Sequence, residues 1–309
     1  MKKKNFLVTG AAGFIGAAVA IKLLDDGNFV VTIDNLSTGF MENIPKGTVF
    51  IEGDCSNQES IDQLKPFRFD TILHIAGQSS GEISFGNPAY DLKTNTLSTL
   101  LLLKYAHEHG CRKFIYASTM SVYGNQLDEP VTEEALLSPL SFYAVGKIAS
   151  ENYMKIYSEF GMTNIALRFF NVYGPGQDMK NLKQGMVRIF LAQAINSKKI
   201  IVRGNPERYR DFVYIDDAVD VIYKLNNISR IKGYLCLNVS TGIRTEVREL
   251  IQIIKSNFNF EIPCEYAEST PGDQFGIYGN NNRLKKIVSI SNFVNLNDGI
   301  HNMIKKLNL

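Results

Sequence analysis

The sequence predicts an α/β protein built on a doubly wound parallel sheet, with a smaller C-terminal α/β region. Three observations support this prediction. Short runs rich in β-branched and aromatic residues alternate with longer helical patterns through the first half of the chain. A glycine-rich turn joins the first of these runs to the first helical pattern. After residue 170 the regular alternation gives way to Gly, Pro, Asn and scattered aromatic residues.

The elements of the first half follow one another in the order of βαβ units, which build a parallel sheet. Strands are expected over 5–10, 29–34, 48–54, 69–77 and 113–119, and helices over 15–27, 60–65, 98–110 and 143–161. The last two helices should end at Gly110 and Gly161, because glycine readily adopts the left-handed conformation that closes a helix.

At 309 residues, the chain can form one large domain or two ordinary ones. We expect a first domain over residues 1–170 and a second region over 171–309, with shorter helices at 186–195 and 247–258. The segment at about 212–238 regains the regular strand and helix pattern, so we expect it to return to the first domain.

The composition is that of a soluble folded protein, with 45% hydrophobic and 21% charged residues. A net charge of +2 predicts no broad basic face, which argues against nucleic acid as a partner. The apolar run at residues 99–106 is far short of the roughly 20 residues that cross a bilayer, so no membrane segment is expected. Four cysteines lie far apart without a CxxC pair, which predicts neither a metal site nor a disulfide scaffold and suits a reducing cytoplasm.

Gly10, Gly13 and Gly16 lie directly after the first strand, at the start of the first helix. Such glycines allow a tight turn, close approach of a pyrophosphate and close packing of helix on strand, but a trio alone is weak evidence. Asp34 ends the second strand 18 residues after Gly16, where an acid would bind the adenosine ribose and repel a 2′-phosphate. The combination predicts a Rossmann-like domain that binds NAD rather than NADP. Asp54, after the third strand, would lie near the adenine, although a strand-end cap explains it nearly as well.

Tyr143 and Lys147 lie four positions apart in a helical pattern, so both side chains can point at one reacting atom. An adjacent ammonium and the positive nicotinamide ring would favour the phenolate and make it a base near neutrality. With 14 tyrosines, about one such pair is expected by chance, and it could equally lie on a solvated helix face. The strand and loop upstream offer the hydroxyls of Ser118, Thr119 and Ser121, one of which could hold a substrate oxygen.

Together with further motifs, these residues resemble the extended short-chain dehydrogenases/reductases, in the nucleotide-sugar epimerase/dehydratase family. The resemblance extends over almost the whole chain. Besides the glycine trio, it rests on DNLSTG from Asp34, GD at Gly53, HIAGQ from His74, NP at Asn87, Asn95, STMSVYG, YAVGK, RFFNVYGPG from Arg168, RDFVYIDD from Arg210 and PGD from Pro271.

The resemblance implies NAD as cofactor and a catalytic triad of Thr119, Tyr143 and Lys147. The residues expected at the cofactor are Gly10, Gly13, Phe14, Ile15, Gly16, Asp34, Asn35, Asp54, Cys55, Ile75, Ala76, Gly77, Asn95, Tyr143, Lys147 and Phe170. Those expected at a nucleotide-sugar substrate are Ser79, Ser80, Thr119, Ser121, Asn171, Arg210 and Asp273. The planar guanidinium of Arg210 suits a diphosphate, because it can bind two oxygens at once.

The resemblance further implies an epimerase that inverts C4 of a UDP-hexose or UDP-N-acetylhexosamine through a transient keto-sugar. Dehydratases of the family carry acidic residues directly after the catalytic Ser or Thr, whereas this chain has Met120 and Ser121, which disfavours dehydration. A reductase, an epimerase acting at another carbon and a catalytically silent dinucleotide sensor are the alternatives. The 4-epimerases usually have an arginine where this chain has Thr270, a contact that Arg208 or Arg283 could replace.

The resemblance also implies a homodimer, because family members commonly pair through the two helices that correspond here to the segments of Asn95 and Tyr143. The sequence itself shows only that residues 99–106 are more apolar than one side of a helix requires. Burial in the core of a single chain explains that run equally well.

Overall fold

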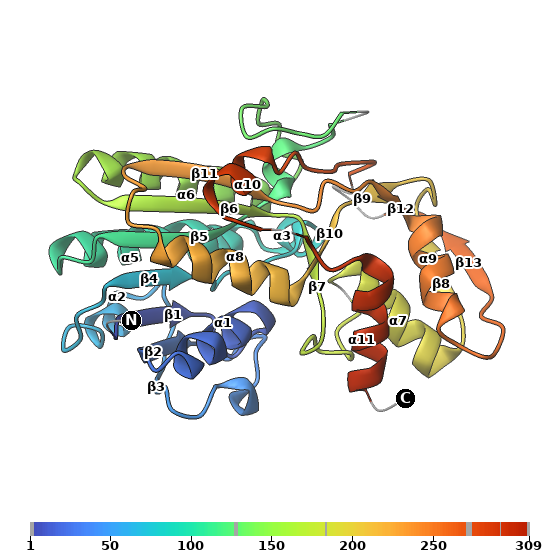
Figure 1. Cartoon of the computed structure of the whole chain (residues 1–309), viewed down its shortest axis with the longest axis horizontal. Helices are drawn as coiled ribbons and strands as arrows, with labels where there is room; N and C mark the ends of the chain where they lie inside the picture. Colours follow the sequence, from blue (N-terminus) through green and yellow to red (C-terminus); the bar gives the residue numbers. More distant parts are fainter. Residues whose placement is uncertain (1–2, 127–128, 183, 270–273, 291, 308–309) are drawn as a thin grey trace.

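The computed structural model describes residues 3–126, 129–182, 184–269, 274–290 and 292–307. Its centre is a seven-stranded sheet in the order β11-β6-β5-β4-β1-β2-β3 (Figure 1). These strands are β1 (Asn5–Thr9), β2 (Phe29–Asp34), β3 (Val49–Glu52), β4 (Thr71–His74), β5 (Lys113–Thr119), β6 (Thr163–Phe169) and β11 (Tyr234–Val239). All neighbouring strands pair in parallel, which confirms the predicted Rossmann-like α/β fold.

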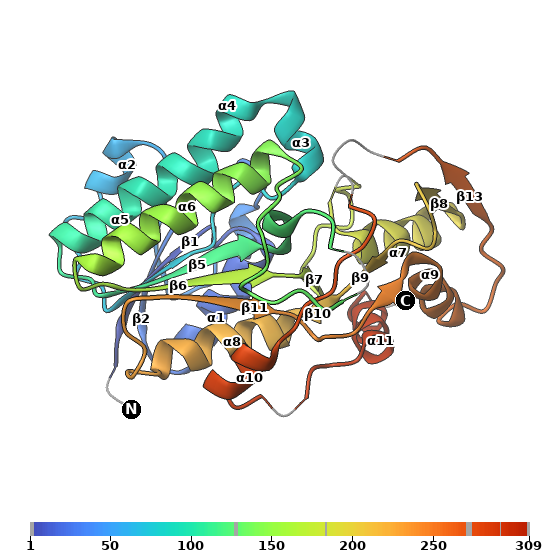
Figure 2. The ribbon, with the colours of Figure 1, turned by 90° about the horizontal axis from the view of Figure 1, so that it is seen from above.

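Helices cover both faces of the sheet, as Figure 2 shows. On one face α1 (Phe14–Asp25) packs against α8 (Ile215–Asn227), and α10 (Asn282–Ile287) lies beside β11. On the other face α5 (Ser98–Glu108) packs between α2 (Gln58–Asp62) and α6 (Phe142–Glu159). This arrangement leaves the carboxyl ends of the strands as the free edge at which a ligand can enter.

The sheet separates two hydrophobic cores. Successive side chains of a strand point to opposite faces, so Phe6 and Val8 of β1 pack into one core and Leu7 packs into the other. Strands buried on both faces are apolar along their length, which is why the sequence shows them as continuous apolar runs rather than alternating ones.

The connection between β4 and α5 is built from three consecutive helical segments. They are α3 (Gly81–Gly86), α4 (Pro88–Asp91) and the π-helical segment η2 (Leu92–Leu97), which continues directly into α5. Two short 3₁₀ turns, η1 (Met41–Asn43) and η3 (Met120–Tyr123), follow β2 and β5. Both η2 and η3 lie next to predicted catalytic residues, so irregular helix geometry borders the site.

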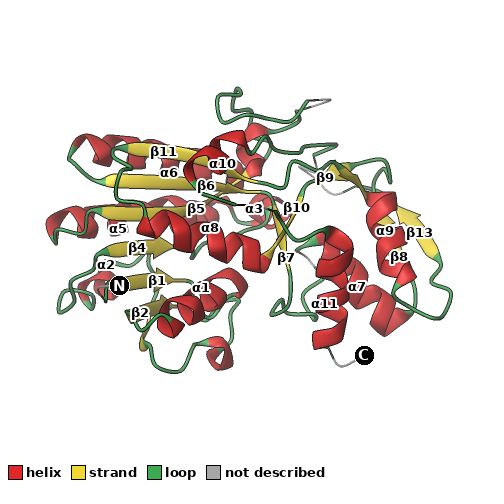
Figure 3. Ribbon diagram, in the orientation of Figure 1, coloured by secondary structure: helices red, strands yellow, loops and turns green. Residues whose placement is uncertain are grey.

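The remaining elements form a C-terminal lobe beside the sheet (Figure 3). Its strand pairs are β7 (Asn171–Tyr173) with β10 (Phe212–Tyr214), β8 (Ile200–Arg203) with β13 (Cys264–Ala267), and β9 (Tyr209–Arg210) with β12 (Thr245–Glu246). Its helices are α7 (Met186–Ser197), α9 (Val247–Ser256) and α11 (Leu296–Lys306). The predicted shorter helices at 186–195 and 247–258 correspond to α7 and α9.

The chain crosses between the two parts more than once. After β10 it returns to the sheet as α8 and β11, and α10 packs against β11 before α11 rejoins the lobe. The domain limits expected from the sequence, 1–170 with a return at about 212–238, stay a prediction. None of the helices in the described part of the chain has the length and apolar character that a membrane span requires.

Candidate active site

A cavity of about 550 Å³ opens along the carboxyl ends of the sheet strands. Residues directly after β1, β4 and β6 line it, among them Gly10, Ile75 and Phe170, together with Asp34 at the end of β2. Parallel sheets bind ligands at this edge, where neighbouring connections leave in opposite directions. The predicted cofactor and catalytic residues other than Asn95 therefore line the crevice that the fold offers to a ligand.

The glycine trio forms the turn between β1 and α1. Gly10 has φ +72°, and a Cβ there would lie 2.8 Å from the backbone of Ala76. A Cβ on Gly16 would lie 2.1 Å from the carbonyl oxygen of Gly10, so the helix can approach the strand only without one. No side chain caps the start of α1 and its first turn carries no acidic residue. Its N–H groups are thus available to a phosphate.

Asp34 holds its carboxylate in a fixed position at the cavity wall. One oxygen accepts a hydrogen bond from the N–H of Ala12 at 2.9 Å, and the other accepts one from Leu36 at 2.8 Å. Asn35, Asp54 and Cys55 line the same part of the cavity. Asp54 also accepts hydrogen bonds from the N–H and hydroxyl of Ser56, both at 2.8 Å, so it also caps the turn after β3.

Asn95 lies in η2 and is fully buried. Its amide nitrogen donates to the carbonyl of Gln78 at 3.0 Å and to Asp91 at 3.1 Å, whereas its Oδ1 has no hydrogen-bond partner among the described residues. A Cβ on Gly77, which has φ +148°, would lie 2.4 Å from that oxygen. The π-helical turn thus presents a free acceptor close to the cavity, and such turns often mark functional sites.

The predicted triad comes together at the cavity wall. Thr119 ends β5, and its hydroxyl lies 3.2 Å from the Ser121 hydroxyl. Tyr143 and Lys147 lie on α6 and are 8% and 3% exposed. The Lys147 Nζ donates to the carbonyl of Ala117 at 2.8 Å and lies 5.6 Å from the centre of the Tyr143 ring. The three side chains can therefore act on one substrate hydroxyl.

The protein groups alone do not acidify the phenol. Burial raises the pKa of Tyr143 to about 12, and the nearby Thr119 hydroxyl opposes this only in part. Burial also lowers the pKa of Lys147 to about 7, against the attraction of Asp91 and Glu151. The expectation from the sequence combined the lysine with the positive nicotinamide ring of the cofactor, and it stays a prediction. A further positive charge at the site is needed to stabilise the phenolate.

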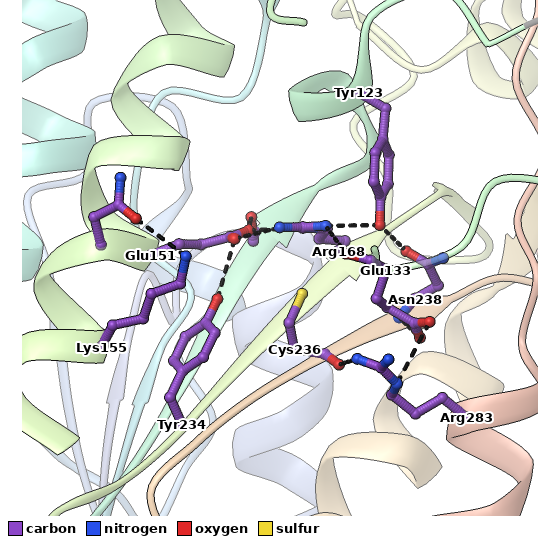
Figure 4. Close-up of polar contacts among 11 residues, drawn as sticks. Tyr123, Glu133, Glu151, Lys155, Arg168, Tyr234, Cys236, Asn238 and Arg283 are labelled. Carbon is purple, nitrogen blue, oxygen red and sulfur yellow. Dashed lines mark hydrogen bonds and ion pairs between the residues drawn. The ribbon is translucent and has the colours of Figure 1, made fainter. Parts of the chain in front are cut away.

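A buried ionic network, drawn in Figure 4, joins α6, which carries Tyr143 and Lys147, to the central sheet. Glu151 on α6 pairs with Arg168 on β6, with 2.7 Å between Oε2 and Nη2. The hydroxyl of Ser118, the neighbour of Thr119, donates to Glu151 Oε1 at 2.6 Å, and Arg168 donates to the hydroxyl of Tyr123 at 2.8 Å. Glu151 was not predicted from the sequence, because no motif distinguishes it from an exposed helix glutamate.

The residues predicted for the substrate divide into two groups. Ser79, Ser121 and Asn171 line the cavity, and Asn171 donates to the carbonyl of Asp211 at 2.9 Å. Ser80 differs from the expectation: its hydroxyl caps α3 by accepting from the N–H of Ile83 at 3.3 Å, and it is absent from the described cavity lining.

The arginines expected at a diphosphate do not line the described cavity. Arg210 donates to the carbonyls of Tyr209 and Phe275, at 2.8 and 3.2 Å. Arg208 donates to the carbonyl of Asn205, and Arg283 pairs with Glu133 at 3.7 Å on the far side of the network of Figure 4. Asp273 and Thr270 lie outside the described residues.

The C-terminal lobe contributes cavity residues that the sequence analysis did not identify. They are Gln177, Asp178, Asn181, Gln184 and Arg188, from the segment between β7 and α7 and from the first turn of α7. No motif marks them. The only signal that could have found them is their position after the RFFNVYGPG stretch, which brings the chain back to the cavity.

Comparison with known proteins gives a consistent result. The model of the NAD dependent epimerase/dehydratase family matches residues 6–232. The UDP-glucose 4-epimerase of Mycolicibacterium smegmatis is 32% identical over 303 residues, which cover 95% of each chain. The crystal structure of UDP-glucose 4-epimerase from Thermotoga maritima with UDP-glucose is similar with a TM-score of 0.92, 31% identity and 98% of both chains covered. The UDP-glucose 4-epimerase of Thermus thermophilus in complex with NAD gives a TM-score of 0.91 and 30% identity, over 98% of this chain and 99% of the other.

Proposed function

This chain belongs to the NAD-dependent epimerase/dehydratase family, its cofactor is NAD, and we propose that it inverts C4 of a UDP-hexose or UDP-N-acetylhexosamine. The observation that carries the proposal is that Thr119, Tyr143 and Lys147 line the wall of a cavity that also contains the fixed carboxylate of Asp34. The triad residues handle the proton of a sugar hydroxyl, and the Asp34 carboxylate positions a dinucleotide without a 2′-phosphate.

The residues present fit NAD. Gly10 and Gly16 leave a cradle that a Cβ would fill, and the uncapped first turn of α1 suits the pyrophosphate. Asp34 would accept hydrogen bonds from the adenosine ribose. At the end of the cavity that contains the triad, the Oδ1 of Asn95, which has no partner among the described residues, and the amine of Lys147 lie near Gly77. Bound there, NAD supplies a hydride acceptor and a positive ring.

In this proposal Tyr143 removes the proton of the C4 hydroxyl as the C4 hydride leaves the sugar, which gives a 4-keto-sugar. Thr119 and Ser121 hold the reacting oxygen through their hydroxyls. The amine of Lys147 lies beside the phenol and is oriented by the carbonyl of Ala117. The keto-sugar then rotates in the site. Tyr143 returns the proton to the oxygen while the hydride adds to the opposite face of C4, so the reaction has no net redox change.

Elimination of water would need an acid and a base beside the carbons next to the ketone. Met120 and Ser121 follow Thr119 at that place, and the Sδ of Met120 lies 3.6 Å from the amide of Asn171. The carboxylates among the described cavity residues are those of Asp34, Asp54 and Asp178, none of which follows the triad threonine. This distribution favours epimerisation over dehydration.

The proposal is tested by incubating the purified protein with UDP-, GDP-, CDP- and dTDP-sugars and following the products by NMR. We expect one UDP-sugar to reach an equilibrium of two C4 epimers without net formation of NADH. Tyr143→Phe should lower the rate by about 10²–10⁴ because the proton acceptor is lost. A product inverted at another carbon, or stoichiometric consumption of NADH without inversion, would refute the proposal.

We also propose that two copies pair through α6 and the η2–α5 segment. Phe142, Val145 and Ile156 of α6 and Phe160, its C-cap, are 47–60% exposed, and Leu92 of η2 is 58% exposed. An apolar stripe of this kind on helices of the sheet face is costly in water.

A further inference from the structure

Arg188 is a buried cation at the cavity wall. It belongs to the first turn of α7, is 6% exposed and lines the cavity together with Gln184 and Gly185. One of its terminal nitrogens donates to the carbonyl of Gln184, but its Nε has no hydrogen-bond partner among the described residues. No described carboxylate forms an ion pair with it, although Asp178 is near enough to attract its charge. An unpaired buried guanidinium is costly, so the arrangement calls for an anion.

The start of α7 provides a second element of an anion site. The helix is 12 residues long, and its N-cap is Gly185 with φ +77°, which has no side chain to bond the first N–H groups. The first turn carries no acidic residue. The N–H groups that open the helix and the positive end of the helix dipole lie on the same turn as Arg188.

The charges around the cavity leave this role to Arg188. The charged groups in the described lining are Asp34, Asp54, Asp178, Lys147 and Arg188. Lys147 donates a hydrogen bond to the Ala117 carbonyl and belongs to the triad. The start of α1 would bind the pyrophosphate of the dinucleotide. Arg188 is therefore the one guanidinium in the described lining, and it comes from the lobe opposite the dinucleotide cradle.

We propose that Arg188 and the first turn of α7 bind the diphosphate of the nucleotide-sugar substrate, an inference that rests on the proposed function. A guanidinium offers paired donors and the helix start offers backbone donors, so adjacent phosphate groups can be bound together. The resemblance leads one to expect an arginine at position 270, where this chain has threonine, and Arg188 would supply the guanidinium from another element. Arg283 forms an ion pair with Glu133 and is not among the residues of the described cavity lining.

The test is calorimetric titration of the NAD-loaded enzyme with UDP and with uridine. Arg188→Gln should weaken UDP binding by about 10–100-fold, because charge-assisted hydrogen bonds to the diphosphate are lost. Uridine, which has no phosphate, should bind wild type and variant within about twofold of each other. Arg203→Gln, an exposed arginine on β8 of the same lobe, is the matched control and should bind UDP like wild type.

Two further measurements keep the inference testable if Arg188→Gln does not fold. Arg188→Lys keeps the charge but loses the planar fork, so it should bind UDP with intermediate affinity. In the wild type, inorganic pyrophosphate should compete with UDP. Folded Arg188→Gln or Arg188→Lys that binds UDP as tightly as wild type would overturn the proposal. A loss confined to nucleotide uronates would do so too, since it would assign Arg188 to a sugar carboxylate.

The outcome can be told apart from failure of the proposed function. If UDP binding depends on Arg188 but no supplied sugar is inverted, the diphosphate site stands and the epimerase proposal falls. If sugars are inverted and Arg188→Gln leaves KM unchanged, the epimerase proposal stands and this one falls. With both correct, Arg188→Gln raises KM by about the factor seen in the UDP titration and leaves kcat within about threefold.

Discussion

Lys147 is the residue whose protonation couples the site to the stability of the fold. It is 3% exposed, and burial lowers its pKa to about 7, whereas an unfolded lysine titrates near 10.4. Below pH 7 the folded protein therefore bears the full cost of a buried ammonium. Between the two values the unfolded chain binds a proton that the folded chain does not, so the free energy of unfolding rises with pH in this range.

Replacing Lys147 with methionine should remove this pH dependence. With NAD stripped off, the difference in unfolding free energy between wild type and Lys147→Met should move in favour of wild type from pH 6 to pH 10, by about 4 kcal/mol at most. Urea unfolding at several pH values measures it. Lys155→Met, an exposed lysine of the same helix, should show a constant difference. A constant difference for Lys147→Met as well would mean that its pKa is not lowered.

Single residues also show which parts of the site can be predicted from the sequence. Asp34 and Tyr143 reach the cavity as predicted, because each is tied to a regular element with a fixed period: the end of a strand and the face of a helix. Ser80 does not line the described cavity, because a serine before a helix is as well suited to capping as to binding a sugar. Arg188 carries no motif. Only the three-dimensional structure brings it to the cavity wall.

At the level of elements, the pair of Glu151 and Arg168 fixes α6 to the sheet. Both side chains are nearly fully buried, and Ser118 and Tyr234 donate to the same carboxylate at 2.6 and 3.1 Å. The network joins β5, β6, β11 and the helix that carries Tyr143, so it sets the height of α6 over the strand that ends at Thr119.

Removing one partner of the pair should be strongly destabilising. Glu151→Ala leaves the Arg168 charge buried without a partner, which costs about 3–5 kcal/mol of unfolding free energy in urea unfolding. The double variant Glu151→Leu, Arg168→Met should cost less than the sum of the single changes, since no charge stays behind. Glu108→Gln breaks the exposed pair with Lys104 and should change stability by less than about 1 kcal/mol. Additive costs would show that the two groups do not act as a pair.

Regular elements could be predicted from the sequence, and irregular ones could not. The strands and long helices follow from apolar runs and from glycines such as Gly110 and Gly161, which have φ +73° and +85°. The π-helical turn at Leu92–Leu97 left no sequence signal, because its geometry depends on tertiary contacts such as that of Thr96 with the carbonyl of Gly146 on α6. The free oxygen of Asn95 could not be predicted for the same reason, because it results from the geometry of this turn.

For the whole molecule, the repeated crossing between the sheet and the C-terminal lobe is what forms the cavity. The sheet supplies the glycine turn and the triad, and the segment between β7 and α7 supplies the opposite wall. The resumed strand and helix pattern near residue 212 predicted a return of the chain. The short strand pairs of the lobe carry too few residues to show a period, so their partners could be found only in the structure.

The exposed stripe on α6 makes the oligomeric state a property that can be tested directly. If two copies pair there, sedimentation should give twice the chain mass of 34.6 kDa, and Val145→Glu combined with Ile156→Glu should give the single mass, because the charges would be buried without partners. Tyr266→Glu is the control, since Tyr266 is 66% exposed on β13 in the other lobe and should leave the dimer intact. A wild type that sediments as a single chain, or a double variant that stays dimeric, would contradict pairing through α6. Because both changes point away from the cavity side of the helix, where Tyr143 and Lys147 are buried, the monomeric variant should still bind UDP.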